Sequence, residues 1–268
     1  MTATRSPLDP GRVRALLADG GWTSPLPQLR ASVGSTNAEV AALGDEPEGT
    51  CVVGEEQTAG RGRHGRSWDS PVHAGLWMSV LIRPGAVDPA RWGWLPLIAG
   101  LAARDAVRAL QPIPLDLKWP NDLVVQHAAC GGSNGTAKAG GVLAEVVGPD
   151  AVAVGIGINV SLDSDELPTQ AATSLLLEGG STDREALLAG ILLSLRGRLA
   201  QWRTDDPALA RDYRAACVTI GRLVDVVLPG EERLQGMVIG IDDAGRLLVE
   251  SDSHVRTVTA GDVIHATI

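Results

Sequence analysis

The densest group of chemically useful residues runs from Gln57 to Arg66, with the sequence Gln-Thr-Ala-Gly-Arg-Gly-Arg-His-Gly-Arg. Its glycines let the backbone adopt positive φ and bring N–H groups close to an anion. Its arginines, Arg61, Arg63 and Arg66, concentrate positive charge in a chain whose net charge is −9. The run therefore predicts a phosphate-binding loop. It lacks the Gly-Lys-Ser/Thr of a Walker loop and matches the dinucleotide fingerprint weakly, and a solvated basic hairpin tip remains the alternative.

A second group, Lys118-Trp-Pro-Asn-Asp122, ends a segment with an extended pattern. Pro120 disfavours helix at the residue before it, so Lys118, Asn121 and Asp122 are expected at the end of a strand. A lysine and a carboxylate in that setting suit a phosphate group and its Mg²⁺, which prefers one or two carboxylates plus phosphate oxygens. The spacing alone equally allows a simple surface ion pair between Lys118 and Asp122.

The two lysines of the chain, Lys118 and Lys138, stand out because the 23 basic residues are otherwise arginines. We expect them to mark positions where a compact ammonium is needed and a guanidinium fork would not fit, with chance as the alternative for either one alone. Ser35, Thr36 and Asn37 precede a helical pattern. They are typical of a helix N-cap.

Composition narrows the class of protein. With 268 residues, 44% apolar and 21% charged, the chain is expected to form one large domain or one domain with a small appendage. Its acidic balance and lack of a basic tail argue against nucleic-acid binding. Cys51, Cys130 and Cys217 form no disulfide or zinc pattern. No apolar run is long enough to span a membrane or resembles a signal peptide, so we expect a soluble cytoplasmic protein that binds neither DNA nor membranes.

Alternating helical and extended patterns must position these residues. The periodicity predicts helices over residues 11–18, 38–43 and 92–110, and strands over 28–33, 50–55, 76–82, 115–119, 141–147 and 151–158. A further helix is expected to start at a Thr182–Glu185 capping box. Residues 127–137, which are small and polar, predict a flexible surface loop, and Gly148-Pro149-Asp150 predicts a hairpin turn. The tail predicts a small barrel, with strands over 223–228, 237–241, 246–250 and 255–259.

Together these motifs resemble the biotin protein ligases, over about residues 28–268. The resemblance rests on Gly34-Ser-Thr-Asn37, the run from Gln57 to Trp68, Lys118 to Asp122, Lys138-x-Gly-Gly-x-Leu-x-Glu145 and Gly155-x-Gly-x-Asn159, in that order. It implies an α+β fold, with a central mixed β-sheet flanked by helices, a class II synthetase-like catalytic domain, and a small C-terminal SH3-like β-barrel. We expect an N-terminal helix and linker over 1–26, the catalytic domain over 27–218 and the barrel over 219–268.

The resemblance implies an ATP-dependent ligase that activates biotin as biotinyl-5′-AMP with release of pyrophosphate, using Mg²⁺. Biotin then passes to a lysine of a biotin carboxyl carrier domain of an acyl-CoA carboxylase. Family members that also act as repressors carry an N-terminal winged helix for which this chain has no room, so a monofunctional ligase is expected, as a monomer or weak homodimer. The alternatives are a lipoate-type acyl-adenylate ligase and a non-catalytic biotin-sensing protein.

Site roles follow from the same resemblance. It implies catalytic roles for Lys138, Arg61 and Arg63. The residues expected to bind biotin are Ser35, Thr36, Asn37, Gln57, Arg61, Gly62, Arg63, Lys138, Gly140 and Gly141. Those expected to bind ATP or the adenylate are Arg63, Arg66, Trp68, Lys118, Asn121 and Asn159.

Asp122 is expected to bind Mg²⁺ or the incoming lysine. The two lysines lie further apart than is usual in the family, so we expect the insertion between them to bulge outward and leave Lys138 in place. The arginine–glycine loop is expected to be mobile without ligand and to close over the adenylate.

Overall fold

A seven-stranded sheet forms the body of the protein, whose computed structural model describes residues 5–126, 135–230 and 232–265 of 268. The strands lie in the order β1-β2-β3-β7-β6-β5-β4. The β1–β2 pair is parallel and the other pairs are antiparallel, so the sheet is mixed, as predicted. The strand bounds are β1 Gln28–Arg30, β2 Cys51–Gly54, β3 Gly75–Ile82, β4 Leu115–Lys118, β5 Asp122–Gln126, β6 Thr136–Val146 and β7 Val152–Asn159.

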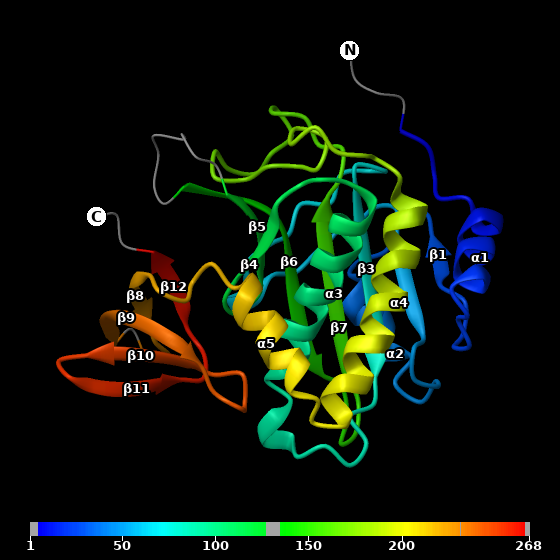
Figure 1. Cartoon of the computed structure of the whole chain (residues 1–268). Helices are drawn as coiled ribbons and strands as arrows, with labels where there is room; N and C mark the ends of the chain where they lie inside the picture. The colour runs from blue at the N-terminus through cyan, green and yellow to red at the C-terminus, as the bar shows by residue number, and fades with distance from the viewer. Residues whose placement is uncertain (1–4, 127–134, 231, 266–268) are drawn as a thin grey trace.

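Helices cover both faces of the sheet (Figure 1). Because successive side chains of a strand point to opposite faces, Met78 and Val80 of β3 join the core beneath α3 and α4, whereas Leu81 packs with Val40 of α2. The helix bounds are α1 Pro10–Asp19, α2 Thr36–Ala42, α3 Trp94–Leu110, α4 Arg184–Arg203 and α5 Pro207–Ala216, with short 3₁₀ turns at Arg63–Gly65 and Pro89–Arg91. None of the helices in the described residues is long and apolar enough to cross a membrane.

The N-terminal helix α1 packs along α4, and its Leu17 is fully buried in the main core. A buried ion pair fixes the segment before it. Arg184 of α4 donates to Glu55 at 2.6 Å and to the Ser6 carbonyl at 2.6 Å, while the other Glu55 oxygen accepts from the Leu8 N–H at 2.6 Å. The first residues that the structure describes are therefore part of the main body.

A separate five-stranded antiparallel sheet forms the C-terminal unit, which we call the barrel (Figure 1). Its strands are β8 Leu223–Val227, β9 Arg233–Ile241, β10 Leu247–Ser251, β11 His254–Val258 and β12 Asp262–His265, in the order β11-β10-β9-β8-β12. Together with the helix-flanked mixed sheet, this confirms the predicted fold class.

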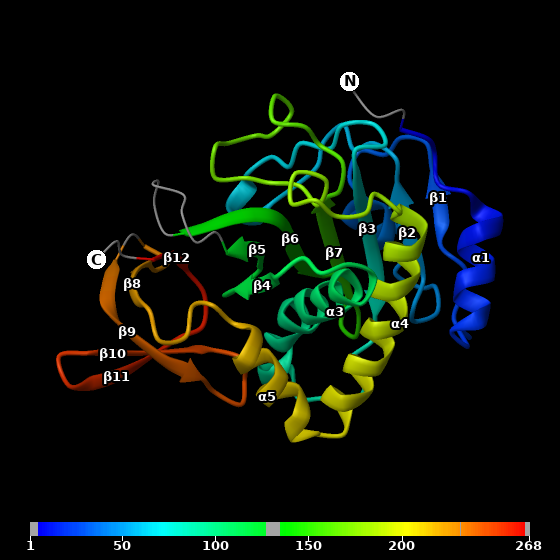
Figure 2. The same cartoon turned by 45° about the horizontal axis from the view of Figure 1, so that its top comes forward.

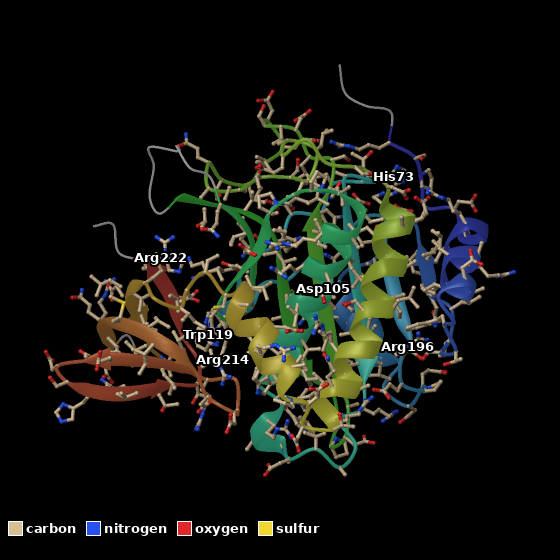
Figure 3. The ribbon with its side chains drawn as sticks, in the orientation of Figure 1. His73, Asp105, Trp119, Arg196, Arg214 and Arg222 are labelled. Atoms are coloured by element: carbon tan, nitrogen blue, oxygen red, sulfur yellow. The ribbon has the colours of Figure 1, made fainter. Side chains whose placement is uncertain are left out.

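The turn between β9 and β10 attaches the barrel to the main body. The indole N–H of Trp119 donates to the Gly245 carbonyl at 3.0 Å, and that of Trp94 donates to the Asp243 carbonyl at 2.8 Å. Arg214 of α5 donates to the Ile241 carbonyl at 3.0 Å. Figure 3 shows Trp119 and Arg214 at this boundary, and Figure 2 shows the same junction from a tilted view.

Several element predictions need correction. The capping box at Thr182 is wrong, because the N-cap of α4 is Asp183, whose carboxylate accepts from the Ala186 N–H at 3.0 Å. Strands β5 and β12 and helix α5 were not predicted. Strand β6 starts at Thr136, so the end of the predicted surface loop is strand, while residues 127–134 lie outside the described residues. The hairpin at 148–150 is confirmed by the Val147–Ala151 hydrogen bond of 3.0 Å.

Candidate active site

A cavity of about 660 Å³ lies on the face of the sheet that carries α2. Its walls come from the start of α2, the arginine–glycine run, the turn between β4 and β5, strands β6 and β7, and the barrel. A volume of this size is in the range that holds a drug-sized organic ligand. The site therefore joins segments that are distant in the sequence, and one of its walls is the C-terminal barrel.

Glycines on β6 and β7 make the floor of the cavity. A Cβ atom at Gly157 would lie 3.0 Å from the Trp68 indole, and one at Gly155 would lie 2.4 Å from the side-chain oxygen of Asn37. A Cβ at Gly141 would lie 3.3 Å from Trp68 and 3.4 Å from the Lys138 side chain. The glycines of the Gly155-x-Gly-x-Asn159 motif thus leave space for the polar and aromatic groups above the sheet.

A polar network holds the start of α2 against the sheet. The Asn37 amide donates to Glu145 at 2.7 Å and to the Leu143 carbonyl at 3.2 Å, while its oxygen lies 2.6 Å from the buried Ser79 hydroxyl. The Gln57 oxygen accepts from the Thr36 N–H at 2.8 Å and from its hydroxyl at 3.0 Å. Both amides already have partners within the protein.

Ser35 differs from its neighbours in this network. It occupies the N-cap position of α2 but makes no side-chain capping bond, and its hydroxyl has no hydrogen-bond partner among the residues that the structure describes. Ser35 is only 4% exposed and lines the cavity. Its hydroxyl is open to the cavity, so Ser35 is suited to a polar ligand rather than to capping.

The arginine–glycine run forms a tight hairpin. The Trp68 N–H donates to the Gly60 carbonyl at 2.9 Å, and the Gly62 N–H donates to the Arg66 carbonyl at 2.7 Å. The tip turns through two left-handed residues, His64 at φ 56° and Gly65 at φ 72°. The basic hairpin that we considered as the alternative is present, and its tip, although exposed, also contacts the barrel.

Two contacts define how the hairpin tip meets the barrel. Arg63 donates to the Gly261 carbonyl at 3.3 Å and to Asn121 at 3.3 Å. Arg66 forms an ion pair with Asp262. Burial lowers the pKa of Arg63, an effect that the nearby carboxylates of Asp262 and Asp122 oppose.

Lys138 and Asp122 form the central ion pair of the cavity. The Lys138 ammonium lies 2.5 Å from an Asp122 oxygen and 5.4 Å from the centre of the Trp68 ring, within cation–π range. The backbone of Lys138 is held on both sides, since its N–H donates to the Ala171 carbonyl at 2.7 Å and its carbonyl accepts from the Thr173 N–H at 2.8 Å. Lys138 is thus fixed on a strand despite the insertion before it.

Lys118 lies directly opposite Asp122 where β4 and β5 meet. Burial lowers its pKa, the Asp122 charge raises it, and the Lys138 charge lowers it. Asp122 therefore acts electrostatically on both lysines of the chain. Within the described residues no cluster of three or more His, Cys, Asp or Glu side chains is arranged for a metal ion. To bind Mg²⁺, Asp122 would have to give up its contact with Lys138. A Mg²⁺ ion that enters with phosphate needs only one protein carboxylate, and Asp122 could supply it.

The structure brings nearly all predicted site residues to this cavity. Those that line it are Ser35, Thr36, Asn37, Gln57, Arg61, Gly62, Arg63, Arg66, Trp68, Lys118, Asn121, Asp122, Lys138, Gly141 and Asn159. Gly140 does not line it, because its missing side chain faces the Gly157 carbonyl at 2.5 Å and Leu123 at 2.9 Å within the sheet. Asn159 is only 4% exposed, and its amide donates to the Thr173 carbonyl at 2.9 Å.

Sequence reasoning assigned no role to three residues at this site. Asp262 reaches the cavity from the barrel, Trp77 supports Trp68 edge-on at 6.3 Å between ring centres, and Ser79 joins the network of α2. Trp77 and Ser79 belong to the apolar pattern of a buried strand, and Asp262 lies in an unpredicted strand. None carried a local signal of function.

Comparison with known proteins agrees with this geometry. Residues 31–163 match the biotin/lipoate A/B protein ligase family, and residues 219–266 match the biotin protein ligase C-terminal domain. The chain is 40% identical to a biotin–[acetyl-CoA-carboxylase] ligase of Mycobacterium tuberculosis, over 97% of both chains. It is 33% identical to a bifunctional ligase/repressor of Bacillus spizizenii, over 84% of this chain and 69% of that one.

Among solved structures, the biotin protein ligase of Aquifex aeolicus in complex with biotin and ATP superimposes with a TM-score of 0.76 at 27% identity. The match covers 90% of this chain and 99% of the other.

Proposed function

Since the chain belongs to the biotin protein ligases of the biotin/lipoate A/B protein ligase family, we propose how its own residues carry out the two steps of that reaction. The enzyme activates biotin with ATP as biotinyl-5′-AMP, releasing pyrophosphate, and transfers biotin to a lysine of an acceptor protein. The observation that supports our assignment most directly is one cavity that unites the arginine–glycine hairpin, both lysines and the polar start of α2.

In the first step the biotin carboxylate attacks the α-phosphorus of ATP and pyrophosphate leaves. Two anions must be brought together, so positioning and charge neutralisation supply most of the catalysis. Lys138 is fixed on β6 with its ammonium in the cavity, and we assign it to the biotin carboxylate and an α-phosphate oxygen. The ammonium then leaves Asp122 and follows negative charge from one reactant to the other.

Arg61 and Arg63 precede the two left-handed residues of the hairpin tip and line the same cavity. We assign them to the phosphate and to closure over the mixed anhydride, which must be kept from water. Arg66, Lys118 and Asn121 line the same cavity, and we assign them to the remaining phosphates. Trp68 spans the floor glycines and is assigned to the adenylate. Mg²⁺, when bound with ATP, neutralises phosphate charge, and Asp122 is the carboxylate assigned to hold it.

The polar start of α2 is assigned to the biotin ring. The Ser35 hydroxyl has no partner among the described residues, Thr36 and Gln57 form the adjoining wall, and the Asn37 amide is already held by Glu145. We therefore assign direct hydrogen bonding to Ser35, because the Thr36 hydroxyl already donates to Gln57 and accepts from Ser79. Thr36, Asn37 and Gln57 either rearrange on binding or set the geometry of the wall.

In the second step the amine of the acceptor lysine attacks the anhydride carbonyl, a C–N bond forms and AMP leaves with the electrons of the broken C–O bond. Asp122 is placed to attract the incoming ammonium before it loses its proton. We propose that the acceptor is a biotin carboxyl carrier domain of an acyl-CoA carboxylase. The name of the Mycobacterium tuberculosis relative, a biotin–[acetyl-CoA-carboxylase] ligase, supports this choice.

Pyrophosphate release tests the activity and separates the rival substrates. We expect release from ATP with biotin and none with lipoate, followed by transfer of biotin to a purified carrier domain. Lys138→Gln should reduce the rate at least ~100-fold, the scale of one lost electrostatic contact to a transition state. Arg256→Gln on the exposed outside of the barrel is the control and should leave the rate unchanged. Release with lipoate alone would overturn the assignment, and biotin binding without any release would indicate a sensor.

We also infer that the enzyme works in the cytoplasm without binding DNA. The buried Cys51 and Cys217 are free thiols, as in a reducing compartment, and the net charge of −9 disfavours a DNA surface. We expect a monomer or a weak homodimer, checked by sedimentation at several concentrations. A gel-shift assay with duplex DNA should give no complex at physiological salt.

A further inference from the structure

A single carboxylate of the barrel faces the basic tip of the hairpin. Asp262 forms an ion pair with Arg66, and its other oxygen lies 3.7 Å from Arg63 and 3.6 Å from the His64 ring. Arg63, His64 and Arg66 lie together at the hairpin tip, separated only by Gly65. The proposed function assigns Arg63 and Arg66 to phosphate. Asp262 is therefore bound by the groups that a phosphate would require.

The backbone around Asp262 fixes it in this place. Gly261 immediately before it accepts from both terminal nitrogens of Arg63 at 3.3 Å. A Cβ atom at Gly261 would lie 2.9 Å from the Val227 carbonyl, so the close approach of β12 to β8 needs glycine there. Asp262 itself pairs with Val227 at the start of β12, and both residues line the cavity.

We propose that Asp262 is the resting counter-ion of the hairpin, which holds its arginines at the mouth of the cavity until the phosphates of ATP replace the carboxylate. This proposal rests on the proposed function, because the phosphates that replace the carboxylate are those of the ATP used in that reaction. Asp262 is a positioning residue and acts through Arg63 and Arg66. Exposed ion pairs are individually weak, so the exchange with phosphate is readily reversible.

Limited trypsin digestion tests this contact through the rate of cleavage in the hairpin, because trypsin cleaves after arginine and the hairpin contains Arg61, Arg63 and Arg66. Without ligand, Asp262→Asn should be cut in the hairpin about five-fold faster than the wild type, the effect of losing weak exposed ion pairs. Asp262→Glu should restore most of the protection. Glu232→Gln, which breaks an exposed barrel pair with Arg256, is the matched control and should be cut like the wild type.

Addition of biotin and ATP should then remove the difference between Asp262→Asn and the wild type, because both hairpins would be held by phosphate. Inorganic pyrophosphate alone should protect Asp262→Asn in part. Mass spectrometry of the fragments assigns each cut. Faster cutting at barrel sites such as Arg233 and Arg246 as well would mean that Asp262 only supports the barrel fold, and this would overturn the proposal.

Equal cutting of wild type and Asp262→Asn in the absence of ligand would overturn it as well. The ligand-free comparison does not depend on catalysis. If Asp262→Asn loosens the hairpin but biotin and ATP protect neither protein, the counter-ion role stands and the proposed function fails. If the ligands protect both proteins but the variants do not differ without ligand, the proposed function stands and the counter-ion role fails.

Discussion

Two glycines of β7 determine how closely the side chains of the site can approach the sheet. Gly157 lies beneath the Trp68 indole and Gly155 lies beneath the Asn37 amide, each at a distance that leaves no room for a methyl group. The motif that contains them could be read from the sequence. The sequence did not reveal that the glycines receive the side chains of two other motifs.

We expect Gly157→Ala to displace Trp68 and to weaken ATP binding by about ten-fold or more. The added Cβ would lie 3.0 Å from the indole, and overpacking of this kind costs about 1–3 kcal/mol. Calorimetric titration with ATP measures the affinity. The control is Gly197→Ala on the exposed side of α4, where a Cβ meets nothing within 4 Å and should raise helix stability by about 1 kcal/mol. Unchanged affinity in Gly157→Ala would show that Trp68 is not part of the nucleotide site.

His265 connects the barrel to the lysine-containing turn. It is 3% exposed, and its Nε2 lies 3.3 Å from the Thr219 hydroxyl, which in turn accepts from the Trp119 N–H at 3.1 Å. Burial, with the charges of Lys118 and Arg222, lowers the pKa of His265 to about 4. The folded protein therefore keeps this imidazole neutral.

This predicts a loss of stability in mild acid. Below about pH 6.5 the unfolded chain protonates His265 while the folded chain does not until about pH 4, so the free energy of unfolding falls across that window. The loss amounts to about 3 kcal/mol at the lower end. Urea denaturation of wild type and His265→Gln between pH 7 and 4.5 measures it, and the variant should show the smaller decline. Parallel declines would exclude His265 as the cause.

How far the site could be predicted depends on how local its signals are. Lys138, Arg63 and Ser35 lie in sequence motifs whose residue types indicate their chemistry, and the structure brings them to one cavity. The number of free hydrogen-bonding groups could not be predicted, because Asn37 is bonded to β3 and β6, and Gln57 is bonded to Thr36 and Ser70. The contribution of Asp262 required knowledge of a contact between the barrel and the hairpin.

At the scale of elements, the buried Arg184–Glu55 pair joins α4, the end of β2 and the N-terminal segment. Both side chains are less than a tenth exposed, and together they satisfy the Leu8 N–H and the carbonyls of Ser6 and Gly75. This pair could not be predicted, since Arg184 lies in the first turn of a helix, where an exposed charge is the usual expectation.

Arg184→Met should lower the free energy of unfolding by about 3 kcal/mol or more, because it leaves Glu55 as a buried charge without its partner. The double variant Arg184→Met/Glu55→Gln should recover part of this loss. Guanidinium denaturation gives the values, and hydrogen exchange should show α1 loosening first. Arg211→Gln, at an exposed pair on α5, is the control and should change stability by less than about 0.5 kcal/mol. A similarly small effect of Arg184→Met would mean that water reaches the pair.

Long elements with an apolar periodicity were predicted well, whereas short or polar elements were predicted badly. The buried α3 and the strands β3 and β7 were found within a few residues of their ends. Strand β12 has only four residues and shows no pattern that stands out from loops. Helix α5 does carry a signal, since Asp206 and Pro207 are typical of a helix start and Leu209, Tyr213 and Ala216 follow at helical spacing, but it is only ten residues long. The cap of α4 was misplaced by one residue because Thr182 and Asp183 are both good N-cap residues.

At the scale of the whole molecule, the barrel is held by backbone carbonyls of one turn that accept from two tryptophans of the main body. Trp119 lies between Lys118 and the turn that leads to Asp122, so barrel and active site share one segment. Docking of the barrel is thereby coupled to the position of both lysines.

Trp119→Phe should loosen the barrel and lower the unfolding free energy by about 1–3 kcal/mol, because the buried Gly245 carbonyl loses its donor. Hydrogen exchange across β8 and β12 would report the loosening. Trp22→Phe removes an indole bond to the carbonyl of the exposed Pro25, which water can solvate instead, and should be nearly neutral. If exchange in the barrel is unchanged in Trp119→Phe, other contacts suffice for docking.

The placement of both lysines at one cavity has a practical consequence. Apart from the amino terminus, every primary amine of this chain belongs to the site, so an amine-selective acylating reagent would report on occupancy without any engineered label. Protection of Lys118 and Lys138 by each substrate in turn would give a chemical footprint of binding order. The scarcity of amines also leaves the outer surface of the enzyme with little that its own reactive acyl-adenylate can modify.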